Sequence, residues 1–277
     1  MIIRFAKEVD KDKIRALWQL CFGDSEVFEA FYFDRIFCPE QTLLILEGSV
    51  PVSSMQILPY SIRIKEKTVS AGYVYGAMTH PSRRGKGYMG KLLQASFEEM
   101  KKRGMQATFL IPQEKWLFDF YAKYGYKEAF PRARKRMAVN GLEPKSKAML
   151  LPEGLSVEMT YSLLLKDRSQ DLVLKSSTQA QLILEEFTLL GGQVFLCAQG
   201  MALAYFDGQR VVVKEMLALS DSIKEELLQA VAHHYRQDEV WVFSYSETND
   251  SDYYGMLRPL DDKLTLPSDV YMSMMFD

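Results

Sequence analysis

A basic, glycine-rich segment in the first half of the chain has the residue types of a diphosphate-binding loop. It reads His-Pro-Ser-Arg-Arg-Gly-Lys-Gly-Tyr-Met-Gly over residues 80–90, between a strand-like run and a helix-like run. Free N–H groups at the start of a helix, together with the helix dipole, attract anions. Gly85 and Gly87 would let a ligand approach the backbone closely, and Arg83, Arg84 and Lys86 add positive charge. The segment therefore predicts a cradle for a diphosphate.

A P-loop is the alternative interpretation of the same glycines. Gly85-x4-Gly90-Lys91 fits the first seven positions of that motif. Its eighth position is a Ser or Thr that binds magnesium, whereas this chain has Leu92, which is better explained as a buried helix residue. No strand ends in an Asp that could serve the metal. A P-loop nucleotide-binding protein is therefore the less favoured alternative.

A second segment with chemical potential is Phe120-Tyr121-Ala-Lys-Tyr-Gly-Tyr126. A tyrosine phenol has an ordinary pKa near 10, so it is protonated at neutral pH and can donate a proton to a leaving group. The same spacing is also typical of core aromatic residues on one face of a helix. On this segment alone, the core interpretation would be preferred.

Together the two segments resemble the GNAT superfamily of acetyltransferases. Residues 74–93 are similar to its acetyl-CoA-binding motif, Arg/Gln-x-x-Gly-x-Gly/Ala. Arg84 and Gly87 hold the first two fixed positions, whereas Met89 stands where a small residue is usual. The Pro-x-x-Arg-x-x-Gly form, followed by a bulky residue, resembles the branch related to the enhanced-intracellular-survival acetyltransferases.

This resemblance implies transfer of an acetyl group from acetyl-CoA to a primary amine, for which a small molecule is favoured, without a metal. Tyr121 matches the tyrosine that serves the family as general acid. In the related branch the C-terminal carboxylate acts as the base, so Asp277 is the candidate here, an exposed tail being the alternative. Backbone amides near Met78–His80 would bind the pantetheine arm and polarise the thioester. The expected cofactor-binding residues are Met78, Thr79, His80, Arg83, Arg84, Gly85, Lys86, Gly87, Tyr88, Met89 and Gly90. An inactive coenzyme A-binding or sensor protein remains an alternative.

The elements needed to position these residues can be read from hydrophobic spacing. We expect a strand at 2–5, helices at 10–21 and 25–36, and strands at 42–47, 51–65 and 68–79. A helix at 87–103, a strand at 106–111 and a short helix at 116–124 follow. This order predicts an α+β (mixed α/β) fold. By resemblance it is a GNAT fold, with a central mixed, mostly antiparallel sheet flanked by helices.

The second half repeats this plan in part. A strand at 211–216, a helix around 227–230 and a strand at 240–243 follow in the same order, and Leu-Leu-Gln-Ala occurs in both helices, at 92–95 and 227–230. We therefore expect a GNAT acetyltransferase domain at 1–140, a linker at 141–152 and a second, degenerate GNAT-like domain at 153–277; one large domain is the alternative. The second copy has Ser220–Lys224 in place of the glycine loop, so we expect it not to bind coenzyme A.

Composition narrows the function classes. The net charge of −2 argues against a general nucleic-acid binder. The three cysteines form no CxxC pair, and the three histidines lack metal-ligand spacing. No apolar run approaches the roughly 20 residues that span a bilayer, and the N-terminus has no signal-peptide pattern. These features predict a cytoplasmic protein with no metal, membrane or nucleic-acid partner; the oligomeric state is open.

Overall fold

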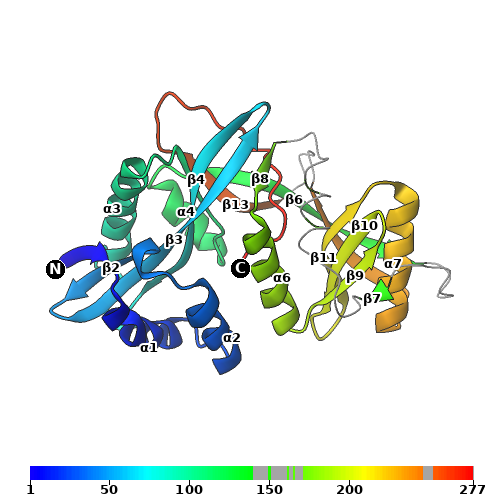
Figure 1. Cartoon of the computed structure of the whole chain (residues 1–277), viewed down its shortest axis with the longest axis horizontal. Coiled ribbons are helices and arrows are strands. Elements are labelled where there is room, and N and C mark those ends of the chain that lie inside the picture. The colour runs from blue at the N-terminus through cyan, green and yellow to red at the C-terminus, as the bar shows by residue number, and fades with distance from the viewer. Residues whose placement is uncertain (140–148, 151–160, 162–164, 166–170, 246–251, 277) are drawn as a thin grey trace.

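One continuous sheet runs through both halves of the molecule (Figure 1). The computed structural model describes residues 1–139, 149–150, 161, 165, 171–245 and 252–276. In this part of the chain the strand order is β1-β2-β3-β4-β5-β13-β6-β12-β11-β10-β9-β7, and β8 pairs with β3. The strands are β1 (Ile2–Phe5), β2 (Thr42–Glu47), β3 (Val50–Ile64), β4 (Lys67–Thr79), β5 (Ala107–Leu110), β6 (Lys127–Ala138), β7 (Met149–Leu150), β8 (Leu172–Leu174), β9 (Gln193–Cys197), β10 (Gly200–Phe206), β11 (Val211–Ala218), β12 (Glu239–Tyr245) and β13 (Asp252–Pro259).

Helices cover the sheet of the first half on both faces. Buried residues of α3 and α4 form one cluster with that sheet, and buried residues of α1, α2 and α6 belong to a second cluster. In the second half α7 packs on β9, β10, β11 and β12. The helices are α1 (Lys11–Cys21), α2 (Glu26–Phe31), α3 (Tyr88–Lys102), α4 (Lys115–Ala122), α6 (Ser177–Leu189) and α7 (Asp221–Tyr235). In the described residues, no helix is both long and apolar enough to cross a membrane.

The expected fold class is confirmed. β4 pairs with β5 in parallel, as does β11 with β12, and the other strand pairs in the described residues are antiparallel. The second half repeats the plan: β9, β10 and β11 are antiparallel neighbours, and α7 connects β11 to the parallel strand β12. The helix expected at 25–36 is shorter, because α2 passes into a wider π-helical turn at Tyr32–Ile36.

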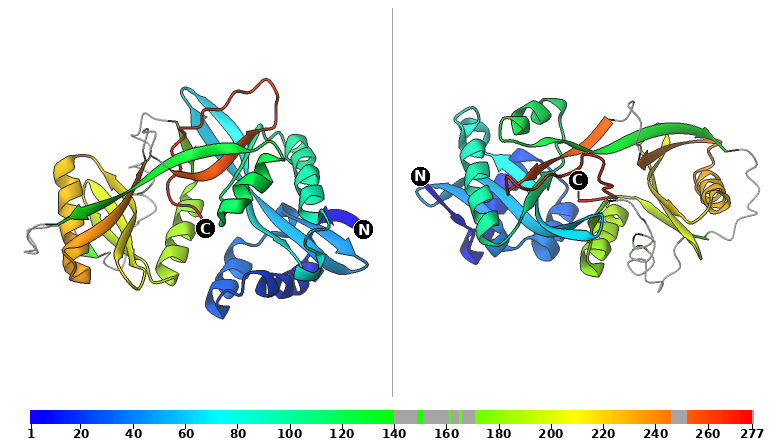
Figure 2. Two further views of the ribbon diagram at one scale, coloured as in Figure 1. Left: turned by 180° about the vertical axis from the view of Figure 1, so that it is seen from behind. Right: turned by 90° about the horizontal axis from the view of Figure 1, so that it is seen from above.

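Two strands join the halves. β6 pairs with β13 through residues 127–132 and with β12 through residues 132–138, so it extends along both halves (Figure 2). β13, near the end of the chain, lies between β5 and β6. The C-terminal part of the sequence thus completes the sheet of the first half. The expected linker lies largely outside the described residues, and the domain boundaries stay a prediction.

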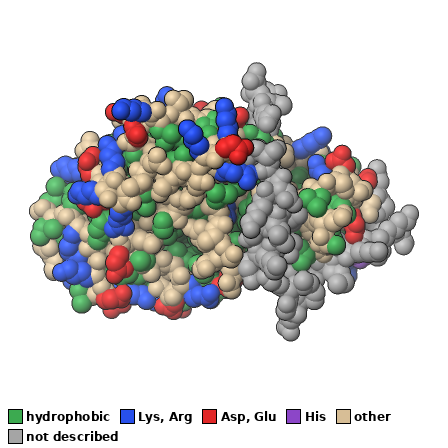
Figure 3. All heavy atoms as spheres, turned by 45° about the horizontal axis from the view of Figure 1, so that its top comes forward, with side chains coloured by type: hydrophobic (Ala, Val, Ile, Leu, Met, Phe, Trp, Pro, Cys, Tyr) green, Lys and Arg blue, Asp and Glu red, His purple; other side chains and the backbone are tan. Residues whose placement is uncertain are grey.

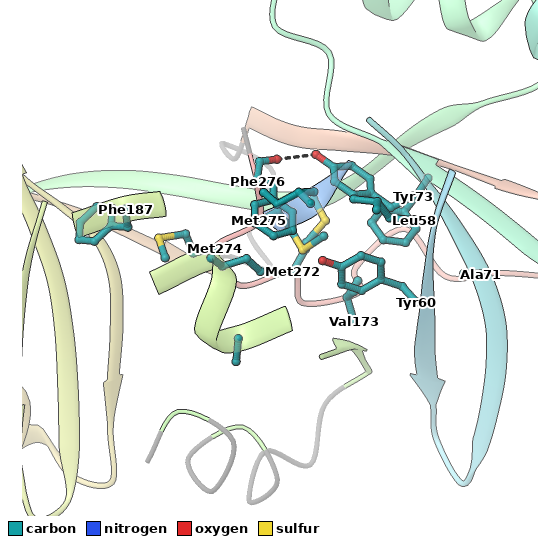
Figure 4. Packing of buried hydrophobic residues seen from close by; sticks show 14 of the residues in the cluster. Leu58, Tyr60, Ala71, Tyr73, Val173, Phe187, Met272, Met274, Met275 and Phe276 are labelled. Carbon is teal, nitrogen blue, oxygen red and sulfur yellow. Dashed lines mark hydrogen bonds between the residues drawn. The ribbon is translucent and has the colours of Figure 1, made fainter. Parts of the chain in front are cut away.

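The last described residues are also buried. Residues 270–276 pack between α6 and the β3–β4 hairpin, and the Tyr73 hydroxyl donates a hydrogen bond to the Phe276 carbonyl oxygen at 2.6 Å (Figure 4). Tyr73 and Phe276 are each 2% exposed. The segment is therefore part of the buried core between the two halves.

Candidate active site

The first structural feature of the site is the divergence of β4 and β5. Their parallel pairing joins Ala71–Val74 to Ala107–Leu110 and then stops. β5 ends there, but β4 continues to Thr79, so residues 75–79 have no strand partner on this edge among the described residues. Unpaired backbone on a strand edge can bind the extended arm of a ligand.

A bulge in β4 lies at this divergence. Ser54 and Gln56 of β3 pair with Met78 and Tyr75, so β4 holds one more residue than β3 in this interval. Gly76 has φ of 58°, and a Cβ there would lie 2.6 Å from the Trp18 ring. We did not identify Gly76 from the sequence, although a glycine inside a strand pattern is the usual signal of a bulge.

The glycine-rich loop forms the second feature. Gly85 and Gly87 have φ of 75° and 76°, in the left-handed region that favours glycine, and a Cβ at either position would meet nothing within 4 Å. Gly87 caps α3 without a side-chain hydrogen bond. Among the described residues, no acceptor is found for the N–H groups of residues 85–90, and Lys91 makes the first bond of the helix, to the Gly87 oxygen. The loop therefore presents a row of free donors, and its residues 85–87 are exposed.

The cationic side chains of the loop differ in their partners. Arg83 forms an ion pair with Glu47 at 2.8 Å, and the Tyr88 hydroxyl donates to the same carboxylate. The Arg83 bond, followed by the Tyr88 bond, holds the pKa of Glu47 below its usual range. Arg84 donates to the Thr79 oxygen at 3.2 Å and, like the exposed Lys86, forms no ion pair within the described ranges. Arg84 and Lys86 are thus the loop cations without an ion pair, and Lys86 interacts with Glu47 only at longer range.

Gly90 is needed for packing between α3 and the turn after α4. It is buried, and a Cβ there would lie 1.9 Å from the hydroxyl oxygen of Tyr124. Met89, next to it, packs against the buried cluster of α3 and α4. Tyr124 thus reaches the first turn of α3, a contact that the sequence does not reveal.

The end of β4 is fixed by hydrogen bonds to β3. The Ser53 hydroxyl donates to the Met78 oxygen and shares a bond of 2.9 Å with the Thr79 hydroxyl. The His80 N–H donates to Val52 at 2.9 Å, so this amide is already used, and the His80 ring accepts from the Ser82 N–H. His80 therefore acts here as the cap of the turn before the loop.

Tyr121 lies in the α4 segment, beneath the divergence. It is 7% exposed and belongs to the same buried cluster as Val74 and Leu110, the last paired residues of β4 and β5. Burial raises the pKa of Tyr121 to about 12. Its hydroxyl forms no hydrogen bond with any described residue. The phenol is therefore protonated at neutral pH.

Three further expectations have different outcomes. Leu92 is fully buried on the core-facing side of α3, as expected. A magnesium-binding hydroxyl at that position would face the core, so the P-loop interpretation is wrong. Asp277 lies outside the described residues. The part of the chain that is described contains no cluster of three or more His, Cys, Asp or Glu residues suited to a metal ion.

One face of the first half carries both signs of charge, with Lys and Arg side chains interspersed with Asp and Glu (Figure 3). A cavity of about 260 Å³ adjoins the loop and is lined by residues including Glu47, Val52, His80 and Arg83. The cavity therefore has both an acidic and a basic side chain in its lining.

Comparison with known proteins agrees with this geometry. Residues 2–129 match the family described as "Acetyltransferase (GNAT) domain". Residues 2–129 are a GNAT acetyltransferase domain. GNAT proteins as a family transfer acyl groups from acyl-CoA, which supports acyltransferase activity. The search of curated proteins gives no match.

Solved structures with the same fold extend over both halves. A GCN5-related N-acetyltransferase from Anabaena variabilis is 17% identical with a TM-score of 0.74, covering 94% of this chain and 73% of that one. Eis1 from Mycobacterium abscessus is 13% identical with a TM-score of 0.69, covering 94% and 74%. A tandem GNAT protein from the clavulanic acid biosynthesis pathway is 11% identical with a TM-score of 0.53, covering 95% and 100%. The two-domain GNAT arrangement therefore accounts for almost the whole chain.

Proposed function

We propose that this GNAT protein transfers an acetyl group from acetyl-CoA to a primary amine of a small molecule. The observation that carries the proposal is the row of free N–H groups over residues 85–90, which begins α3 beside the unpaired edge of β4. An anion at a helix start is stabilised by these donors and by the helix dipole. The diphosphate of acetyl-CoA fits this position, and its pantetheine arm fits the edge of residues 75–79.

The proposed reaction is direct attack of the amine on the thioester carbonyl. A tetrahedral intermediate forms, the C–S bond breaks, and Tyr121 donates its proton to the departing thiolate. The raised pKa of Tyr121 supports the role of acid, because it keeps the phenol protonated across the working pH range. The amine must lose a proton before it attacks. That Asp277 takes this proton stays a prediction, tested by comparing turnover by the chain with turnover by a chain extended beyond Asp277.

Turnover against a panel of amines tests the activity. Coenzyme A release would be followed with acetyl-CoA and polyamines, aminoglycosides, amino acid derivatives and a lysine peptide. We expect activity on a small-molecule amine, and a fall in kcat of about 10²–10⁴-fold in Tyr121→Phe with unchanged acetyl-CoA affinity, the usual contribution of a general acid. Saturable coenzyme A binding without transfer to any amine would instead favour a coenzyme A-binding sensor.

The binding loop has its own test with a matched control. Gly87→Ala adds a methyl group beside the proposed diphosphate and a strained backbone, whereas Gly104→Ala adds the same strain at the end of α3. Gly104 has φ of 75°, and a Cβ there would also meet nothing within 4 Å. Calorimetry should show weaker coenzyme A binding for Gly87→Ala, with a similar, small loss of stability in both variants. Equal coenzyme A affinity in the two variants would contradict the proposed cradle.

A further inference from the structure

A cavity lies in the second half, at a position equivalent to the candidate site of the first half. β11 and β12 pair in parallel only from Val211–Val213 to Val240–Val242 and then diverge, as β4 and β5 do. A cavity of about 460 Å³ opens at this divergence, beside the start of α7. This volume suits a small organic molecule.

This cavity differs from the first site in how the helix begins. The Ser220 hydroxyl accepts from the Ile223 N–H and caps α7, and the loop has no glycine. The far wall is supplied by β6 and by the C-terminal segment, through residues such as Arg132, Tyr271 and Met274. The site is therefore lined by residues of both halves of the chain and lacks the open row of donors that a diphosphate needs.

Arg132 is a preformed cation in the cavity wall. Its guanidinium lies 4.0 Å from the ring centre of Phe243 and 4.2 Å from that of Tyr254, and it donates to the Lys214 oxygen at 3.1 Å. Within the described ranges it forms no ion pair. An arginine fixed between rings retains donors in a planar arrangement that matches a carboxylate or phosphate.

The other charged side chains leave the cavity with excess positive charge. Lys214 and Lys224 also line it, and Lys224 has no ion-pair partner among the described residues. Glu215 is 7% exposed, and its two oxygens accept hydrogen bonds from the Tyr271 hydroxyl and the Met274 N–H. Asp221 lies in the first turn of α7, where the positive end of the helix dipole stabilises its negative charge. Glu215 is thus held by hydrogen bonds, whereas Arg132 and Lys224 form no ion pair among the described residues.

We propose that this cavity is a second ligand site, which binds a small organic anion, a carboxylate or phosphate ester with an apolar group. Arg132 and Lys224 bind the anionic group. Phe243, Tyr254 and Met272 provide apolar surface for the remainder. The proposal does not depend on acetyl transfer in the first half.

Calorimetric titration of the full chain with phenyl phosphate and with phenylacetate tests the site, with benzyl alcohol as the uncharged control. We expect saturable binding of at least one anion and none of the alcohol. Arg132→Gln should weaken binding about tenfold or more, since a hydrogen bond to a charged group contributes roughly that much. Lys224→Gln, on the surface of α7, should weaken it severalfold.

Arg134→Gln is the matched control, because Arg134 lies on the same strand over Trp241 and outside the cavity lining. It should bind like the unmodified chain. Saturating coenzyme A should leave anion binding unchanged, since the sites are separate. The proposal is overturned if neither anion binds, if Arg132→Gln and Lys224→Gln bind as well as Arg134→Gln, or if coenzyme A displaces the anion.

Discussion

Replacing Tyr73 by Phe tests how the C-terminal segment is held. The Tyr73 hydroxyl donates to the Phe276 oxygen at 2.6 Å, and both residues are almost completely buried (Figure 4). Tyr73→Phe keeps the ring, which stacks on Phe109 at 5.0 Å between centres. The substitution therefore removes the hydrogen bond to Phe276 and leaves a buried carbonyl without that donor, while the ring packing is kept.

The expected cost is about 1–3 kcal/mol of unfolding free energy, the usual penalty for leaving a buried polar group unsatisfied. Tyr60 supplies the control. Its ring lies 5.9 Å from that of Tyr73 in the same cluster, but its buried hydroxyl has no partner among the described residues. Tyr60→Phe removes an unsatisfied group, so it should leave stability unchanged or raise it slightly.

Urea unfolding of the full chain, followed by circular dichroism, measures the difference. We expect a lower midpoint for Tyr73→Phe at an unchanged slope, and a midpoint at or above that of the unmodified chain for Tyr60→Phe. If both substitutions shift the midpoint equally, or if Tyr60→Phe is the more destabilising, the assignment of the hydrogen bond as the anchor of residues 270–276 is refuted.

Three further outcomes are expected. Burial lowers the pKa of Lys175 from 10.5 to about 7. Between these two pH values the unfolded chain binds a proton that the folded chain does not. The free energy of unfolding should therefore rise from pH 7 to pH 10 and be constant below pH 7. Lys175→Met should remove this rise in thermal melts across that range, and an unchanged pH profile would contradict it. Gly90→Ala should lower the free energy of unfolding in urea by about 1–3 kcal/mol, because the added methyl group overpacks against Tyr124. If this loss is no larger than that of Gly104→Ala, Tyr124 moves freely and the prediction is wrong. Because the pKa of Tyr121 is about 12, the kcat profile should show no loss assigned to this phenol below pH 10, and a loss near pH 8 that is absent in Tyr121→Phe would refute this.

The sequence determined the features that depend on a few neighbouring residues. Gly85 and Gly87 adopt left-handed φ, and α3 begins directly after them, because backbone freedom and helix start signals are local. The burial of Leu92 follows from its place in the helical pattern. The repeat of strand, helix and strand in the second half was visible for the same reason.

Only the tertiary structure decided which distant segments meet. Nothing local to Asp252–Pro259 specifies insertion between β5 and β6, since a strand edge pairs with whichever apolar strand the rest of the fold presents. The contacts of Arg83 with Glu47 and of Gly90 with Tyr124, and the cavity around Arg132, likewise join residues far apart in the chain. Such contacts are set by how whole faces pack together, and spacing along the sequence does not carry that information.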